Sequence, residues 1–250
     1  MQQKYRTPCG QTRQVVNFIP KKEELYHMRK DNDLAKIAIS FIPGLLFVLI
    51  LWMVKWYEWQ YHCRLSDYGL FPRKLSGIPG IITMPFLHGD FEHLISNSIP
   101  LMVLLTGLIY FYRRLALKVF VWIWLLSGFW LWLGGRPSYH IGASAIIYGL
   151  TVFLFFSGIF RKDRRLMALS LLVVFLYGSL IWGILPIVEE HSWEGHLFGS
   201  CAGLLMAIIY KKQGPQRPPY SWELNNDADV EDGPDAYWRG HDPPPADKQA

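Results

Sequence analysis

The sequence is poor in charge. Only 18% of its 250 residues are charged, whereas 51% are hydrophobic and 16% are aromatic. The charged residues gather in short clusters between long apolar runs, which is the pattern of a membrane protein. The net charge of +5 is therefore interpreted as a feature of membrane topology. The sequence argues against nucleic-acid binding, because no soluble stretch interleaves basic and aromatic residues.

Cysteine is scarce as well. The three cysteines, Cys9, Cys63 and Cys201, lie far apart in the sequence, which argues against a disulfide framework or a cysteine-based metal cluster. The first 33 residues are polar and basic, and they lack the apolar core of a signal peptide. We therefore expect the first apolar helix to act as its own insertion signal.

Six apolar runs have about the length of a membrane-spanning helix, which rises about 1.5 Å per residue. They predict an all-α polytopic membrane protein with a six-transmembrane-helix bundle over residues 34–212. Pro43-Gly44 is expected to kink the first helix. The long external loop at 57–92 keeps enough aromatic and aliphatic residues to lie in the membrane interface. The predicted spans are about 35–56, 93–112, 116–134, 141–160, 166–187 and 194–211.

Basic residues mark one side of the predicted bundle. The loops at 113–118 and 161–165, together with residues 211–212, hold nine Lys and Arg residues. The opposite loops hold Arg136 and acidic residues. By the positive-inside rule, both termini are predicted to be cytoplasmic.

The two ends of the chain are predicted to be cytoplasmic tails. Residues 1–33 are expected to form either an unstructured tail or a short helix near anionic lipid. Residues 213–250 are rich in proline and acidic residues, so they are expected to be disordered. The charge bias and the lack of a targeting peptide lead us to expect a bacterial inner (cell) membrane protein.

Polar residues in the apolar runs converge on one depth. His93 and Asn97, spaced i and i+4, share one helix face at an external helix end. Ser144 and His196 lie at the external ends of two other predicted helices. Singly, such residues are explained by an interfacial position or by helix packing. Together, they favour a polar site, because ionisable groups in a membrane face a bundle interior or a cavity.

The chemistry of these groups fits nucleophilic catalysis. A serine hydroxyl becomes a nucleophile when a base takes its proton, and a neutral imidazole is suited to that task. The candidates are Ser144 and His196, with Asn97, His93 and the Ser144 backbone N–H as oxyanion donors. No cofactor is required for this chemistry.

Small residues offer a way to bring the helices together. Gly199 and Gly203 follow His196 at i+3 and i+7, and a Gly-x-x-x-Gly face lets two membrane helices approach closely. Tyr148 lies one turn below Ser144 on the same face. Its ring either stacks on the imidazole of His196 or serves as plain packing, and the sequence does not separate these two readings.

With these residues in this order, the chain resembles the rhomboid family of intramembrane serine proteases. The resemblance covers residues 34 to 210 and is carried by three motifs in the family's order. They are His88-x4-His93-x3-Asn97, Gly142-Ala143-Ser144 with Tyr148, and His196-x2-Gly199-x3-Gly203.

The resemblance implies a role for each matching residue. Ser144 would be the nucleophile and His196 the general base, without an acidic third member. The oxyanion hole would be formed by His93, Asn97 and the Ser144 amide, with Gly142 shaping the approach. Tyr148 would stack on His196, and His88 would keep the cavity polar and hydrated.

The sequence departs from the family's pattern in three places. The residue after the nucleophile is commonly glycine and is here Ala145, whose methyl would shift the Ser144–His196 distance slightly. The residue before the base is commonly alanine and is here Gly195. A Trp-Arg pair that is frequent in the loop after the first helix is absent.

The leading hypothesis is therefore an intramembrane serine endopeptidase that cleaves single-span membrane proteins near their external boundary. Its partners would be transmembrane protein substrates and the lipid bilayer. The first alternative is a catalytically inactive rhomboid-like protein that binds transmembrane segments. A transporter would distribute its polar groups through the bilayer instead of clustering them at one end. A zinc enzyme could use His88, Asp90, His93 and His196, but the sequence has no His-Glu-x-x-His motif, and no metal site is expected.

Overall fold

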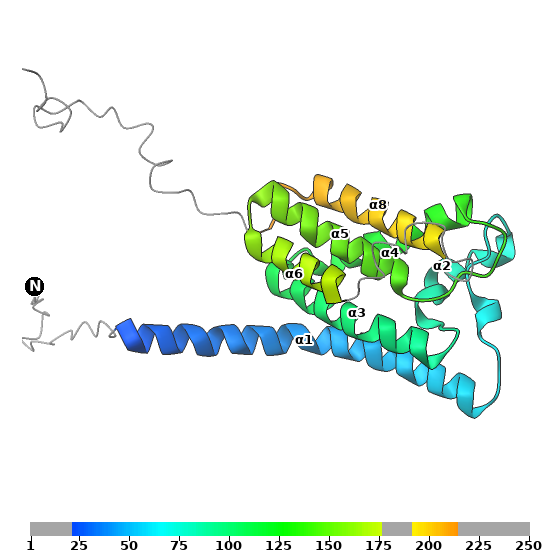
Figure 1. Ribbon diagram of the computed structural model, residues 1–250, viewed down its shortest axis with the longest axis horizontal. Helices are drawn as coiled ribbons and strands as arrows, with labels where there is room; N and C mark the ends of the chain where they lie inside the picture. Colours follow the sequence, from blue (N-terminus) through cyan, green and yellow to red (C-terminus); the bar gives the residue numbers. More distant parts are fainter. Residues whose placement is uncertain (1–21, 177–191, 215–250) are drawn as a thin grey trace, which may run out of the picture. The chain divides into compact units, whose positions relative to one another are not determined.

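The computed structural model describes residues 22–176 and 192–214 (Figure 1), with side chains at residues 33–172, 174–175 and 192–214. In this part of the chain, every regular element is a helix, and one isolated β-bridge joins Leu70 to His140. The longer helices are α1 (Lys22–Gln60), α3 (Phe91–Tyr112), α4 (Ala116–Gly134), α5 (Ser144–Arg161), α6 (Arg164–Leu176) and α8 (Trp193–Ile209). The short ones are η1 (Ser66–Tyr68), η2 (Leu75–Gly77), α2 (Gly80–Thr83) and η3 (Met84–Phe86).

Four of the described helices are long and apolar enough to cross a membrane. They comprise residues 33–60 of α1 together with α3, α4 and α5. The sixth predicted span corresponds to α8, which is apolar but only 17 residues long. The fifth, at 166–187, begins in α6 and continues into residues outside the described part of the chain. The all-helical membrane fold is thus confirmed, and the count of six spans stays a prediction.

α5 is the central helix of the bundle. Of its span, 67% is buried inside the protein, compared with 22% for the span of α1. Its side chains Ile146, Leu150, Phe153 and Leu154 are fully buried in the main hydrophobic core. Because α1 exposes most of its apolar surface, it is suited to face lipid.

Among the described helices, α5 and α8 form the most extensive contact, and they run side by side in Figure 1. A Cβ atom added at Gly199 would collide with the backbone carbonyl of Ala145, and one added at Gly203 with the carbonyl of Gly149. The two backbones therefore touch, which requires residues without a side chain on this face of α8.

The connection between α1 and α3, predicted as the external loop at 57–92, is packed onto the helices. The indole N–H of Trp124 donates to the carbonyl of Ile81 at 2.8 Å, and that of Trp132 to the carbonyl of Lys74 at 2.9 Å. From α1, the Lys55 ammonium donates to the carbonyls of His88 and Gly89 at 3.0 and 2.9 Å. These bonds fix the segment that leads into α3.

Candidate active site

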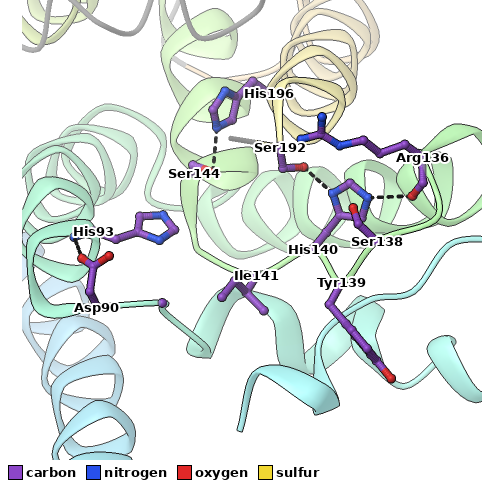
Figure 2. Close-up of a pocket in the computed structure, with 11 residues that line it drawn as sticks. Asp90, His93, Arg136, Ser138, Tyr139, His140, Ile141, Ser144, Ser192 and His196 are labelled. Atoms are coloured by element: carbon purple, nitrogen blue, oxygen red, sulfur yellow. Dashed lines mark hydrogen bonds between the residues drawn. The ribbon is translucent and has the colours of Figure 1, made fainter. Parts of the chain in front are cut away.

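A cavity of about 560 Å³ opens where the N-terminal ends of α3, α5 and α8 meet (Figure 2). Its lining is mostly polar and combines these helix ends with the segment that precedes α5. The lining residues are Gly89, Asp90, His93, Arg136, Ser138, Tyr139, His140, Ile141, Ser144, Ser192 and His196.

Ser144 and His196 face each other across the α5–α8 contact. The distance from Ser144 Oγ to His196 Nε2 is 2.9 Å, which is a hydrogen bond (Figure 2). His196 is 6% exposed, whereas Ser144 is only half-buried, and both line the cavity. For the hydroxyl to donate in this bond, Nε2 must be the unprotonated ring nitrogen. The pair thus has the geometry of a nucleophile and its base.

Tyr148 fixes the plane of the imidazole. Its ring is stacked on that of His196, with a centroid distance of 4.2 Å and an interplanar angle of 11°. Of the two readings of Tyr148 that the sequence left open, the structure has the stacked one. A ring held on one face has fewer orientations, so Nε2 stays directed at Ser144.

Ser144 is the first residue of α5, three residues later than the predicted start of this helix at 141. The reason is Gly142, whose φ of +105° is incompatible with a helix. The Gly142 N–H donates at 2.8 Å to the carbonyl of Met84 in η3. Ser144 therefore lies at a helix N-terminus, where N–H groups lack helical partners and the helix dipole favours negative charge.

Gly142 also brings the backbone against His93 and Asn97. A Cβ atom at Gly142 would lie 2.8 Å from Cε1 of His93 and 3.7 Å from Nδ2 of Asn97. Asn97 is 5% exposed, and its Nδ2 has no hydrogen-bond partner among the described residues. His93 is placed by the N-cap of α3, since the Asp90 carboxylate accepts from its backbone N–H at 2.7 Å. Two of the predicted oxyanion donors, His93 and Asn97, thus lie against Gly142, two residues before Ser144; His93 lines the cavity, whereas Asn97 is not among its lining residues.

Ala145, the departure from the family's glycine, is accommodated without displacing the Ser144–His196 pair. It is 3% exposed and belongs to a small apolar cluster with Leu70, Met84 and Leu131. The hydrogen bond of 2.9 Å is present with this methyl in place.

His88 lies behind His93 and is not among the residues that line the cavity. The two rings are 5.1 Å apart at 68°, and His88 is 3% exposed. Burial, and next the neighbouring His93, lowers the pKa of His88 from 6.5 to about 3, so the ring is neutral. Its contact with His93 is structural support for that ring.

Two groups of residues around the cavity were missed by sequence reasoning. Lys55, near the end of the predicted first span, holds the loop before α3. His140 and Ser192, each four residues before a member of the Ser144–His196 pair, bond to each other. The sequence contained one signal for them, namely a polar residue four positions before Ser144 and another four positions before His196. In the described part of the chain, no group of three or more His, Cys, Asp or Glu side chains is placed to hold a metal ion.

Comparison with known proteins agrees with this architecture. The family model described as "Rhomboid domain" matches residues 76–213. An uncharacterized protein of Mycobacterium tuberculosis is 37% identical over 187 residues, covering 69% of this chain and 75% of the relative. A Mycobacterium leprae protein, also uncharacterized, is 31% identical over 199 residues, covering 74% and 76%. A Bacillus subtilis protein named "Putative rhomboid protease YdcA" is 25% identical over 146 residues, covering 55% and 69%.

The fold and the cavity together define this protein as a multi-pass helical membrane protein with a polar cavity between helix ends. The chain belongs to the rhomboid family. Members of this family are generally serine intramembrane proteases that act on membrane-protein substrates within the bilayer, and the relatives named above are bacterial.

Proposed function

We propose that this protein is an intramembrane serine endopeptidase that uses Ser144 and His196 as a catalytic dyad. The observation that carries the proposal is the 2.9 Å hydrogen bond between Ser144 Oγ and His196 Nε2 at the wall of a polar cavity. The rhomboid family assignment supports the same reaction class.

In the acylation step, His196 Nε2 accepts the Ser144 hydroxyl proton while Oγ bonds to the scissile carbonyl carbon. The carbonyl oxygen becomes an oxyanion. We assign its stabilisation to Asn97 Nδ2, the His93 imidazole and the Ser144 backbone N–H. The lack of a hydrogen-bond partner for Nδ2 among the described residues supports the assignment of Asn97 as an oxyanion donor.

The tetrahedral intermediate then breaks its carbon–nitrogen bond. The proton on His196 Nε2 goes to the leaving amine, and the substrate is left as an ester on Ser144. A water molecule from the cavity repeats the sequence, with His196 as base, and releases the acid product and free Ser144. The cavity of about 560 Å³ is large enough to hold the water that this step consumes.

The proposed substrates are single-span membrane proteins, cut near the external membrane boundary. The proposal includes six spans with both termini cytoplasmic, which puts the cavity at the external side. A regular transmembrane helix hides its carbonyls in hydrogen bonds, so the substrate must unwind locally to present the scissile bond.

The alternative is an inactive rhomboid-like protein that binds transmembrane segments without cleaving them. Ala145 is the feature that favours it, being the only change next to the proposed nucleophile. Its methyl packs into the apolar cluster and removes no polar group, so the active enzyme is the better supported function.

The test combines co-expression with model single-span substrates and covalent labelling of the purified protein by a fluorophosphonate. The wild type is expected to cleave near the external boundary and to be labelled at Ser144. Ser144→Ala is expected to abolish both, and His196→Ala to reduce both by more than a thousandfold. Cleavage that persists in both variants would refute the assignment, and binding without cleavage or labelling in the wild type would establish the inactive alternative.

A further inference from the structure

A second serine–histidine pair lies next to the proposed dyad, with the two residue types exchanged. His140 precedes Ser144 by four residues, and Ser192 precedes His196 by four. The distance from His140 Nδ1 to Ser192 Oγ is 2.6 Å, and the one from Ser144 Oγ to His196 Nε2 is 2.9 Å (Figure 2). One hydrogen bond thus joins the residues that precede α5 and α8, and the other joins the first turns of these two helices.

His140 is held from several sides. It is 2% exposed, and its backbone pairs with Leu70 through N–H to O bonds of 2.8 and 3.0 Å in both directions. Its ring Nε2 lies 3.1 Å from the carbonyl of Arg136. A carbonyl only accepts, so Nε2 carries the ring proton, and the neutral ring then offers Nδ1 as acceptor to the Ser192 hydroxyl.

Ser192 passes this constraint to α8. Its side chain is the N-cap of the helix, since Oγ accepts from the N–H of Gly195 at 3.3 Å. Its carbonyl accepts from the N–H of His196 at 3.2 Å. The residue that His140 holds therefore sets the first turn of α8, which carries the proposed base.

A buried carboxylate adds a second link between the same two segments. Glu194 is 5% exposed, and its Oε1 accepts from the backbone N–H of Arg136 at 3.4 Å. The same oxygen forms an ion pair with Arg136 Nε at 3.5 Å. The segment Arg136–His140 thus holds the first turn of α8 at two points.

We propose that His140 is a positioning residue that, through its hydrogen bond to Ser192, sets the distance between Ser144 Oγ and His196 Nε2. The proposal rests on the function proposed above for Ser144 and His196. His140 does not touch the reacting atoms. It fixes the cap of α8, and the cap fixes the helix turn that presents the imidazole.

The alternative is that Ser192 is itself a nucleophile with His140 as its base. The structure favours positioning, because Ser192 Oγ already accepts from the Gly195 N–H, and His140 is buried and held by the carbonyl of Arg136. The experiment below separates the two readings by the site of labelling.

The test uses the purified full chain in detergent, with three readouts. These are the rate of fluorophosphonate labelling, kcat and KM for a single-span model substrate, and the midpoint of thermal unfolding. His140→Ala and Ser192→Ala are expected to lower the labelling rate and kcat at least tenfold, with KM within twofold. In the double variant, the labelling rate and kcat are expected to fall no further than in the less active of the two single variants, because the two residues act as one unit.

Conservative and matched variants separate positioning from a loss of folding. Ser192→Thr keeps both the cap and the hydroxyl, so it is expected to restore labelling and kcat to within threefold of the wild type. The control is Ser127→Ala on α4, a fully buried serine whose hydroxyl bonds to the carbonyl of Trp124 in its own helix. It is expected to leave kcat unchanged.

Three results would overturn the proposal in distinguishable ways. A wild-type labelling rate in both His140→Ala and Ser192→Ala, with labelling still lost in Ser144→Ala, refutes the positioning role and leaves the proposed dyad intact. Labelling that survives Ser144→Ala and is lost in Ser192→Ala assigns the nucleophile to Ser192. A wild type that is never labelled refutes the proposed function itself.

Discussion

Asn97 offers a way to separate catalysis from stability at the scale of one residue. Its Nδ2 is buried without a hydrogen-bond partner among the described residues. A buried donor without a partner costs free energy, so removing it is cheap for the fold. Asn97→Ala is expected to lower kcat by about 10²–10³, the usual loss for one oxyanion donor. The unfolding midpoint should change little, and kinetics together with thermal unfolding measure both quantities.

The neighbouring Ser98 is the matched control. Its hydroxyl accepts from the indole N–H of Trp52 at 3.0 Å and donates to the carbonyl of Leu94 at 2.7 Å. Ser98→Ala is therefore expected to lower stability by about 1 kcal/mol and to keep kcat. If Asn97→Ala loses as much stability as Ser98→Ala and keeps its kcat, the role of Asn97 as an oxyanion donor is excluded.

At this scale, the sequence pointed to candidate residues with reactive side chains, but it did not point to the residues that hold those side chains in place. Ser144 and His196 were recognisable because their side chains are chemically unusual in apolar helices. His140, by contrast, acts through a bond to Ser192, which is 52 residues away in the sequence. Only the packed structure brings such a pair together.

At the scale of the element, the contact between α5 and α8 depends on glycine. A Cβ atom at Gly203 would lie within 3.0 Å of three backbone atoms of Gly149, which cannot move aside as a flexible side chain can. Gly203→Ala must therefore push the helices apart. We expect a loss of about 1–3 kcal/mol in stability, as for other overpacked sites. We also expect a lower kcat, because the separation lengthens the Ser144–His196 hydrogen bond.

A glycine in another helix of the bundle provides the comparison. A Cβ atom at Gly44 on α1 would meet its nearest neighbours, Leu105 Cβ and the Met102 carbonyl, at 3.4 Å, which is ordinary contact. Gly44→Ala is expected to keep kcat and stability, as measured by substrate cleavage and thermal unfolding. Equal losses in Gly44→Ala and Gly203→Ala would mean that the α5–α8 contact has no special role.

The elements themselves were predictable in type but not in their ends. The Gly199-x-x-x-Gly203 pattern predicted that α8 has a close helix neighbour. Such a pattern depends only on the spacing of residues within one helix, so it is visible in the sequence. The start of α5 was placed at residue 141 and lies at Ser144. What delays it is the left-handed conformation of Gly142 and its N–H bond to Met84, a contact between distant parts of the chain.

At the scale of the whole molecule, the polarity pattern fixed the class of protein, since long apolar runs have few solutions other than membrane helices. The packing of the connection between α1 and α3 could not be predicted from the sequence. It is held by bonds from Trp124, Trp132 and Lys55 to backbone carbonyls, and any carbonyl can accept such a bond. Residue types therefore gave no signal for these contacts.

Two buried histidines make the stability of the whole molecule depend on pH. Burial, and next the neighbouring His93, lowers the pKa of His88 to about 3. Burial also lowers the pKa of His140, and the carbonyl of Arg136 opposes this in part. In the unfolded chain, histidine titrates near pH 6.5. Below that pH the unfolded state binds more protons than the folded state, so stability is complete above pH 6.5 and falls as the pH decreases.

Unfolding in detergent micelles is therefore expected to become easier from pH 7 to pH 4.5. Each histidine that stays neutral in the fold contributes at most about 1.4 kcal/mol per pH unit. His88→Asn replaces the imidazole by an amide that does not titrate, so its stability profile should be flatter by up to this slope. For Asp163, burial alone would raise the pKa, but its hydrogen bonds with Arg165 outweigh burial and lower it, so this carboxylate stays ionised in the window. Parallel profiles for His88→Asn and the wild type would show that His88 is protonated in the folded protein, contrary to its burial as a neutral ring.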